Sequence, residues 1–437
     1  MSKAETRSAE IAVRALEGHR QWRGKMQTTP KCPVRGIEDF ALWYTPGVAA
    51  VARVVAEDPA QSFDLTDRGD RVAIVSDGSR VLGLGDIGPE AAMPVMEGKA
   101  LLFKYLGGVD ATALCVARHE AGDIVDFVQA IAPSFGGVNL EDIATPKCFR
   151  VLEDLQESLP IPVWHDDQQG TAAAAVAGLI GALEVVGKAM GEIRIALIGA
   201  GAANVSVYRL LKAAGADPAR MRVCDSAGLL HVERADIAAD RHRLREKWMI
   251  CSETNPDRLS GSVKEALAGA DACLAFSAPG PGVIPPEAVA AMARDAIVFA
   301  CANPTPEIWP ETARRAGARI VATGRSDFPN QVNNALVFPG LFRGVLDVRA
   351  RRITDRAALA AAYALVDRAK VLGLGEESLL PQLDDIASAA AVAAAAAEVA
   401  LADGLASVAL SPNRVRDDTA ARIAAARAAT ALISGAG

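Results

Sequence analysis

Aromatic residues are scarce in this chain, at 5% of 437 residues, although hydrophobic residues make up 51%. Alanine, valine and leucine must therefore fill most of the interior, which favours close packing of helices. No uninterrupted apolar run reaches membrane-spanning length, and the polar first thirty residues lack the apolar segment of an export signal. We therefore expect a protein that neither crosses a membrane nor is exported.

Cysteines and basic clusters are also too sparse to define a site. The seven cysteines are scattered without a CxxC pair, which argues against a zinc knuckle or a secreted disulfide framework and predicts a reducing, cytoplasmic location. The net charge is -7, and no stretch combines lysine and arginine with aromatic residues. We therefore expect no nucleic-acid partner.

The chain is long enough for two or three domains. A helical pattern around residues 9–16 opens it, and residues 72–162 alternate strand patterns such as VAIVS and ATALCVA with helices, one expected to open near Pro94. The stretch LPIPVW at 159–164 marks the passage to a second lobe. The pattern predicts a small α/β substrate lobe over residues 1–162.

A second lobe contains five apolar strand patterns, at IALIGA (195), RVCD (222), ACLAF (272), AIVFACA (296) and RIVATG (319). This rhythm predicts a doubly wound parallel sheet of the Rossmann type over residues 163–390, with a ligand crevice beyond the carboxyl ends of the strands. From about residue 355 the chain becomes helical and rich in alanine, and residues 391–437 are expected to form a helical segment for packing or oligomerisation.

The first of these five strands leads into a glycine turn. Gly199 and Gly201 stand between strand and helix, where they allow a pyrophosphate to approach the helix N-terminus. The third fingerprint position holds Asn204, which would either loosen the contact between helix and strand or bind the cofactor. Asp225 ends the next strand, where it would accept a ribose hydroxyl or cap a helix. Because no basic residue follows it immediately, the sequence favours NAD, with NADP as the alternative. The expected cofactor-binding residues are Gly199, Ala200, Gly201, Ala202, Ala203, Asn204, Asp225 and Asn303.

Acidic residues cluster in the stretches VNLEDIA and WHDDQQGTA. Mg²⁺ and Mn²⁺ prefer several oxygen ligands while leaving positions for substrate and water, a need that Glu141, Asp142 and Asp167 would meet. The alternative is that Glu141 and Asp142 begin a helix and favour its dipole. Their combination with Asp167 favours a metal site.

Other polar residues could serve the same site. Lys99, in the apolar segment MEGKALLFK, would act as a base if burial lowered its pKa, or it could be a surface lysine. Tyr44, ahead of a Pro-Gly turn, would donate a proton near Lys99 or anchor the turn. His165 has no partner at ligand spacing, which favours a structural role. Asn303 and Asn334 are amides suited to a carboxylate or nicotinamide, or to turns.

Eight blocks, in order, resemble those of the malic enzymes: YTPGV, VLGLGDIG, EGKALLFK, LEDIA, HDDQQGTA, GAGAAN, ANPTPE and GRSDFPNQVNN. The likeness runs from about residue 20 to 390 and is similar to the compact bacterial type. It implies oxidative decarboxylation of L-malate to pyruvate and carbon dioxide, with a nicotinamide cofactor and Mg²⁺ or Mn²⁺. It also implies a homodimer or a higher homo-oligomer.

The resemblance further implies roles for individual residues. Lys99 would be the base on the malate hydroxyl, Tyr44 the acid that protonates the enolpyruvate carbon, and Asp166 a partner that sets the charge of Lys99. Arg80 would grip a substrate carboxylate, although the segment between it and Lys99 differs by one residue from the larger enzymes. The implied metal ligands are Glu141, Asp142 and Asp167, and the implied substrate-binding residues are Arg80, Lys99, Asn303 and Asn334.

Two other activities fit the same fold. One is malolactic conversion or oxidation of malate without decarboxylation, and the other is a catalytically silent nucleotide-binding protein.

Overall fold

Two parallel sheets form the framework of the protein, whose computed structural model describes the backbone of residues 3–435 and the side chains of residues 9–435. The first sheet has the order β2-β1-β3-β4, and the second has the order β10-β9-β8-β5-β6-β7, with only β7 antiparallel. The first comprises β1 (Arg71–Ser76), β2 (Asp110–Cys115), β3 (Gly137–Leu140) and β4 (Val163–His165). The second comprises β5 (Ile195–Ile198), β6 (Met221–Asp225), β7 (Gly228–Leu229), β8 (Ala272–Ala275), β9 (Ala296–Ala300) and β10 (Ala318–Thr323). The predicted α/β class and the predicted strands of both lobes are thus confirmed.

The first lobe is built by short strands joined through helices. Its helices are α4 (Ser62–Leu65), α5 (Pro89–Gly107), α6 (Ala121–Ile131) and α7 (Lys147–Ser158), with 3-10 turns η1 (Pro59–Gln61), η2 (Asp67–Asp70) and η3 (Ala132–Ser134). The prediction that a helix opens near Pro94 is wrong, because α5 begins at Pro89 and carries Pro94 inside. Proline fits the first turn, where the helix needs no backbone N–H. Since β4 pairs with β3, the first sheet extends slightly past residue 162, and the lobe boundary there stays a prediction.

Helices also surround the second sheet. They are α8 (Thr171–Val186), α9 (Ala202–Ala213), α10 (Ala235–Ala239), α11 (Arg245–Glu253), α12 (Val263–Leu267), α13 (Pro286–Ala290) and α14 (Pro310–Arg315), with the 3-10 turn η5 (Pro218–Arg220). By length and composition alone, residues Asp166–Val186 are long and apolar enough to cross a membrane. However, 78% of this segment's apolar window is buried within the protein. It is the central core helix, as its many small residues allow.

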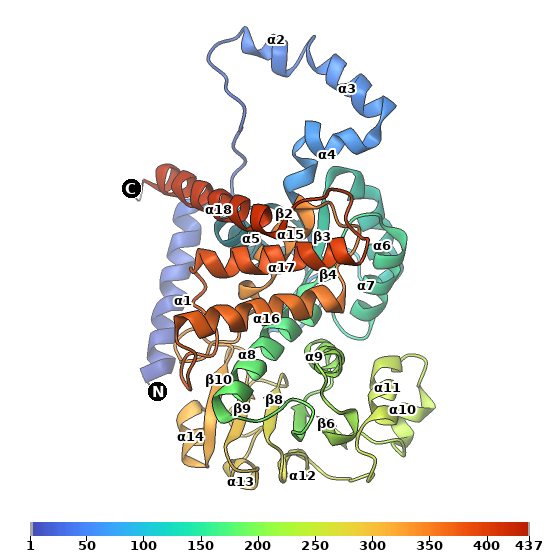
Figure 1. The fold of residues 1–437 in the computed structure, drawn as a ribbon, viewed down its shortest axis with the longest axis vertical. Coiled ribbons are helices and arrows are strands. Elements are labelled where there is room, and N and C mark those ends of the chain that lie inside the picture. The colour runs from blue at the N-terminus through green and yellow to red at the C-terminus, as the bar shows by residue number, and fades with distance from the viewer. Residues whose placement is uncertain (1–2, 436–437) are drawn as a thin grey trace.

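The C-terminal helices pack on both lobes, and Figure 1 shows them as layers across the middle of the molecule. They are η6 (Asn334–Leu336), α15 (Phe338–Asp347), α16 (Asp355–Leu372), α17 (Ile386–Ala402) and α18 (Pro412–Ser434). Fully buried Arg343 of α15 pairs with Asp70 of the first lobe at 2.7 Å and with Asp347 at 2.6 Å. Helix α15, on which α17 and α18 pack, is therefore joined to the first lobe by a buried ion pair as well as by apolar packing.

The N-terminal segment behaves differently. After α1 (Lys3–Trp22), an extended stretch leads to α2 (Asp39–Trp43) and α3 (Val48–Glu57), which stand away from the rest of the chain (Figure 1). Neither α2 nor α3 buries any residue. Apolar side chains in and just before these helices are open to solvent, with Ile37 at 85% and Leu42 at 61% exposure. We call residues 25–57 the arm.

Candidate active site

The acidic residues meet at one edge of the first sheet. Glu141 and Asp142 directly follow β3, and Asp167 lies just beyond β4 in η4 (Asp166–Gly170), which is a π-helical turn. Because β3 and β4 are neighbouring parallel strands, their carboxyl ends bring these residues together. One carboxylate oxygen from each of Glu141, Asp142 and Asp167 lies within 4.8 Å of the others. The arrangement has the oxygen donors that a hard divalent cation requires.

Backbone geometry fixes these carboxylates. Asp142 has a φ of 55°, and its N–H donates to Asp167 Oδ2 at 2.8 Å. Glu141 Oε2 accepts from the Asn139 amide at 3.0 Å. The next helix, α7, begins only at Lys147, so the alternative in which Glu141 and Asp142 begin a helix is wrong. The left-handed backbone at Asp142 turns the chain instead, a conformation that aspartate tolerates.

The cluster carries more negative charge than its surroundings balance. Burial, followed by the charge of Asp167, raises the pKa of Asp142 to about 7. Burial and the neighbouring carboxylates also raise the pKa of Glu141, and burial raises that of Asp167. Asp142 Oδ2 is buried and has no hydrogen-bond partner among the described residues. Both features are those of a site that a cation would complete.

Lys99 of α5 enters this cluster. Its Nζ lies 3.1 Å from Glu141 Oε1 and 3.3 Å from Asn334 Oδ1, and it contacts Asp166 Oδ2. Only 11% of the side chain is exposed, so the surface-lysine alternative is wrong. Burial lowers the pKa of Lys99, but Asp166 and Glu141 raise it by more, and the net shift is upward. The expectation of a lowered pKa is therefore wrong, because it counted burial without the carboxylates.

The carboxylate of Asp166 is positioned by Trp164 and by the space that Gly170 leaves. Its Oδ1 accepts a hydrogen bond from Trp164 Nε1 at 3.3 Å, and its side chain is fully buried. Gly170, at the end of η4, leaves the space that Oδ1 occupies, since a Cβ at Gly170 would lie 1.8 Å from that oxygen. Any other residue at position 170 would displace the carboxylate that contacts Lys99.

His165 does not join the site through a hydrogen bond. It is fully buried, and neither ring nitrogen has a hydrogen-bond partner among the described residues. Its Nδ1 lies 3.9 Å from Asp167 Oδ2, and burial lowers its pKa to about 3. The ring is therefore neutral and packs in the core, in agreement with the structural role expected from the sequence.

Three other expected residues lie in different places. Arg80 is exposed and close enough to Asp167 for its charge to lower the pKa of that carboxyl. Asn303 lines an open cavity with Gly324 and Gln331, beyond the ends of β9 and β10. Tyr44 ends α2 in the arm and is 70% exposed, and Figure 1 shows α2 well apart from the sheets. One chain therefore does not bring Tyr44 to Lys99.

The glycine turn has the geometry expected of a nucleotide-binding turn. Gly199 has a φ of 99°, and a Cβ there would meet the Phe276 carbonyl at 2.5 Å. A Cβ at Gly201 would meet nothing within 4 Å, so the N-terminus of α9 is open to an approaching group. Asn204 is fully buried and donates to the carbonyls of Ile198 (2.8 Å) and Gly199 (3.0 Å). It therefore fastens the helix to the strand, and the expectation that it loosens this contact is wrong.

Asp225 is already paired with two cations. Its carboxylate accepts from Arg234 at 3.1 and 3.3 Å and from Lys247 at 2.9 Å. These partners outweigh burial and lower the pKa of Asp225. No basic residue follows Asp225 immediately in the sequence, but the fold brings two from farther along the chain. The premise that no basic residue stands beside Asp225 is therefore wrong, and the preference for NAD over NADP stays a prediction.

Two family models cover most of the chain. The malic enzyme N-terminal domain matches residues 23–121, and the malic enzyme NAD-binding domain matches residues 168–401. The chain belongs to the malic enzyme family. It is therefore an enzyme with an α/β fold and an NAD-binding domain of the Rossmann type.

Relatives within the malic enzyme family match over more than four fifths of the chain. The bifunctional malic/malolactic enzyme of Bacillus subtilis is 45% identical over 93% of this chain and 97% of its own length. The NAD-dependent malic enzyme of Geobacillus stearothermophilus is 48% identical over 82% of this chain and 73% of its own. The crystal structure of Entamoeba histolytica malic enzyme, 43% identical, superposes with a TM-score of 0.96 over 100% of this chain and 91% of that chain.

Some residues around this malic enzyme's site gave no usable signal in the sequence. Trp164 binds Asp166, and the Phe338 ring centroid lies 4.9 Å from Lys99 Nζ. Fully buried Glu307 accepts from the Ser277 and Ala302 N–H groups, so it ties together the loops after β8 and β9. The block ANPTPE contains Glu307, but the sequence does not indicate that this carboxylate is buried.

Proposed function

We propose that this chain catalyses the oxidative decarboxylation of L-malate to pyruvate and carbon dioxide, reducing a nicotinamide cofactor with the help of one Mg²⁺ or Mn²⁺. The observation that carries the proposal is the position of Lys99, which contacts Asp166 and Glu141 beside the three clustered carboxylates. The printed names of its relatives, both NAD-dependent and NADP-dependent malic enzymes, support it.

The proposed metal ligands are Glu141, Asp142 and Asp167. The unpartnered, buried Asp142 Oδ2 and the raised pKa values of the carboxyl groups fit a bound divalent cation. Such an ion supplies positive charge to the substrate oxygen that becomes electron-rich as carbon dioxide leaves.

The other side chains have proposed roles in binding and proton transfer. The neighbouring carboxylates raise the pKa of Lys99, and a divalent cation held by Glu141, Asp142 and Asp167 would offset that negative charge. Lys99 Nζ would then be neutral and would accept the proton of the malate C2 hydroxyl, while Asp166 and Asn334 hold the amine in place. Arg80 has no side-chain hydrogen bond or ion pair within the described part of the chain, so its guanidinium is available to a substrate carboxylate. Asn303, at the other side of the crevice, binds substrate or the nicotinamide group.

Tyr44 completes the site of a second copy in this proposal. The arm buries nothing within its own chain, yet it presents a row of apolar residues beside Tyr44, with Phe40 52% and Trp43 44% exposed. Apolar residues in that arrangement favour contact with another protein surface. A homodimer with exchanged arms would cover them and would deliver a Tyr44 hydroxyl to protonate the enolpyruvate carbon in the partner's site.

The cofactor proposal includes NADP as well as NAD. The pyrophosphate would bind at the open turn of Gly199–Gly201 and the N-terminus of α9. Arg234 and Lys247 flank Asp225, where the adenosine ribose is expected. Arg234 is shared between Asp225 and Asp236, whereas the one ion pair of Lys247 among the described residues is with Asp225, so that Lys247 would be the cation that meets a 2′-phosphate. The seven free cysteines, five of them buried, support a reducing cytoplasmic compartment.

An initial-rate assay tests the proposal directly. Purified protein with L-malate and Mn²⁺ is expected to form NADH or NADPH together with equal amounts of pyruvate, and a chelator should stop both. Absence of malate-dependent reduction with either cofactor would contradict it. Malolactic conversion is the second candidate, because the Bacillus subtilis relative is named for both reactions. Lactate without net reduced cofactor would identify that reaction, and accumulation of oxaloacetate would identify oxidation alone.

A further inference from the structure

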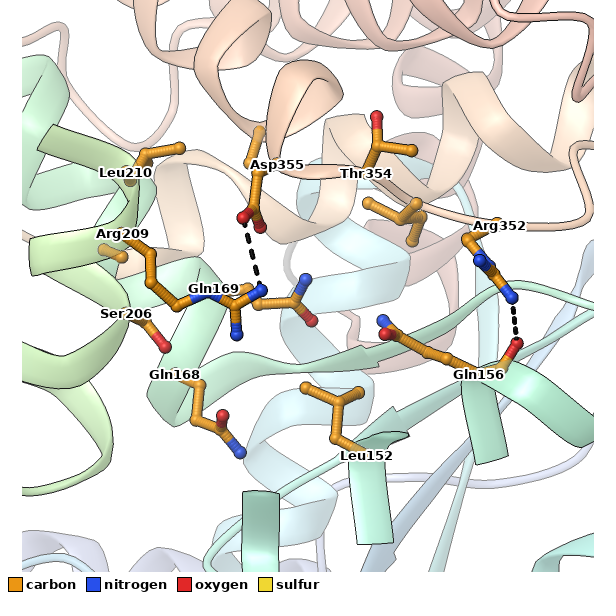
Figure 2. Close-up of a pocket in the computed structure, with 13 residues that line it drawn as sticks. Leu152, Gln156, Gln168, Gln169, Ser206, Arg209, Leu210, Arg352, Thr354 and Asp355 are labelled. Atoms are coloured by element: carbon orange, nitrogen blue, oxygen red, sulfur yellow. Dashed lines mark hydrogen bonds and ion pairs between the residues drawn. The ribbon is translucent and has the colours of Figure 1, made fainter. Parts of the chain in front are cut away.

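A cavity of about 210 Å³ borders η4, the turn that also carries Asp166 and Asp167 (Figure 2). Its walls come from α7 of the first lobe, from η4 itself, from α9 and from the beginning of α16. None of the residues assigned above to substrate, metal or cofactor lines it. Three parts of the chain that are distant in sequence therefore meet around a space with no assigned role.

Two arginines reach this cavity from opposite sides, as Figure 2 shows. Arg352 donates to the backbone carbonyl of Gln156 at 2.7 Å and has no carboxylate within ion-pair distance in the described part of the chain. Arg209 pairs only loosely with Asp355, at 3.4 Å, and both side chains are about half exposed. Two guanidinium groups and one carboxylate leave one net positive charge. The cavity therefore favours an anion.

Neutral donors point to the same kind of ligand. Ser206 is only 7% exposed, and its hydroxyl has no hydrogen-bond partner among residues 9–435. Gln169 uses its side-chain oxygen to accept from the His165 N–H at 3.1 Å, which leaves its amide N–H groups available. The 18-residue helix α16 begins here with Thr354 as its N-cap, and the positive end of its dipole adds to the arginines.

We propose that this cavity binds a small oxyanion, carrying a phosphate or a carboxylate group, and that binding is coupled to the active site. Guanidinium groups, hydroxyls and amide donors are the groups that recognise such anions. The link is structural: Gln169 belongs to the same five-residue turn as Asp166 and Asp167. Ser206 and Arg209 belong to α9, whose N-terminus forms the nucleotide turn. An anion that joins these elements stabilises the arrangement of carboxylates and turn, and so increases turnover.

Binding can be measured without any assumption about catalysis. Purified full-length protein is titrated calorimetrically with inorganic phosphate and, separately, with succinate, at constant ionic strength set by sodium chloride. We expect saturable binding of at least one anion. Arg352→Gln and Ser206→Ala should each weaken it, the arginine variant by about ten-fold or more. Arg351→Gln is the matched control, because this exposed neighbour loses the same charge but does not line the cavity.

The two anions distinguish which group the cavity recognises. Binding of phosphate alone identifies a phosphate group as the ligand, and binding of succinate alone identifies a carboxylate. Binding of neither, or equal weakening by Arg351→Gln and Arg352→Gln, overturns the proposed site.

Coupling is tested by initial rates with malate, with and without the bound anion. Saturating anion is expected to raise kcat/KM for malate by about five-fold or more in the wild type, the lower end of common allosteric couplings, and to leave Arg352→Gln unchanged. A decrease, or an equal change in the variant, overturns the coupling. If no malate turnover occurs at all, the proposed function fails while the calorimetric result still decides the site.

Discussion

Replacement of Gly170 by alanine is the most direct test of how the site is held. A Cβ at this position would lie 1.8 Å from Asp166 Oδ1 and 2.9 Å from its Cγ, whereas ordinary contacts begin at 3.4 Å. The carboxylate must therefore move by about 1.5 Å, and the Cβ of Asn334, 3.3 Å away, limits movement of the new methyl group. The Asp166 carboxylate carries both the contact to Lys99 and the bond from Trp164. Both contacts should be distorted.

Displacement of a catalytic group by about 1 Å can cost about 100-fold in rate, so kcat/KM for malate should fall by about that factor in Gly170→Ala. The nucleotide turn is untouched, so the Kd of the reduced cofactor, measured by its fluorescence, should stay unchanged. Gly122→Ala in α6 is the control, because its new Cβ would meet nothing within 4 Å. A Gly170→Ala enzyme with wild-type kcat/KM would refute the reasoning.

Four further outcomes are expected. A chelator should abolish malate-dependent cofactor reduction, and added Mn²⁺ should restore it; full activity without a divalent ion would count against the carboxylate site. Lys247→Gln should raise KM for NADP by about ten-fold and that for NAD much less; equal losses would contradict a 2′-phosphate contact. Tyr44→Phe and Lys99→Ala should each be inactive alone, while co-expression should recover about a quarter of wild-type activity through hybrid dimers; no recovery would argue against exchanged arms. Burial raises the pKa of Asp70, but Arg343 and Arg422 together outweigh it and lower that pKa, so this stabilisation is complete above about pH 4 and is lost as the pH falls through the folded-state pKa. Asp70→Asn should therefore cost about 2 kcal/mol of unfolding free energy at pH 7, measured by urea denaturation, with a smaller difference below pH 4; a constant difference would exclude this titration.

The sequence was sufficient for the architecture because periodic apolar runs determine strands and helices locally. The strands at 195, 222, 272, 296 and 319 correspond to β5, β6, β8, β9 and β10, and the C-terminal helices lie where alanine-rich patterns begin. The grouping of Glu141, Asp142 and Asp167 was also predictable, since all three follow strands of one sheet.

What the sequence could not provide was the environment of each side chain. The pKa of Lys99 depends on how close Asp166 and Glu141 come, and that of Asp225 on cations brought from 9 and 22 residues downstream. The role of Asn204 depended on two carbonyl groups whose positions only the folded turn defines. Contacts between distant segments decided each of these cases.

Because of the arm, the fraction of active enzyme should depend on protein concentration. Because α2 and α3 bury nothing within one chain, an isolated copy could keep both of its sheets and still lack a tyrosine at its site. Under the proposed exchange, dilution would separate the dimer and abolish activity while each chain stayed folded. Specific activity would then rise with protein concentration until all chains were paired.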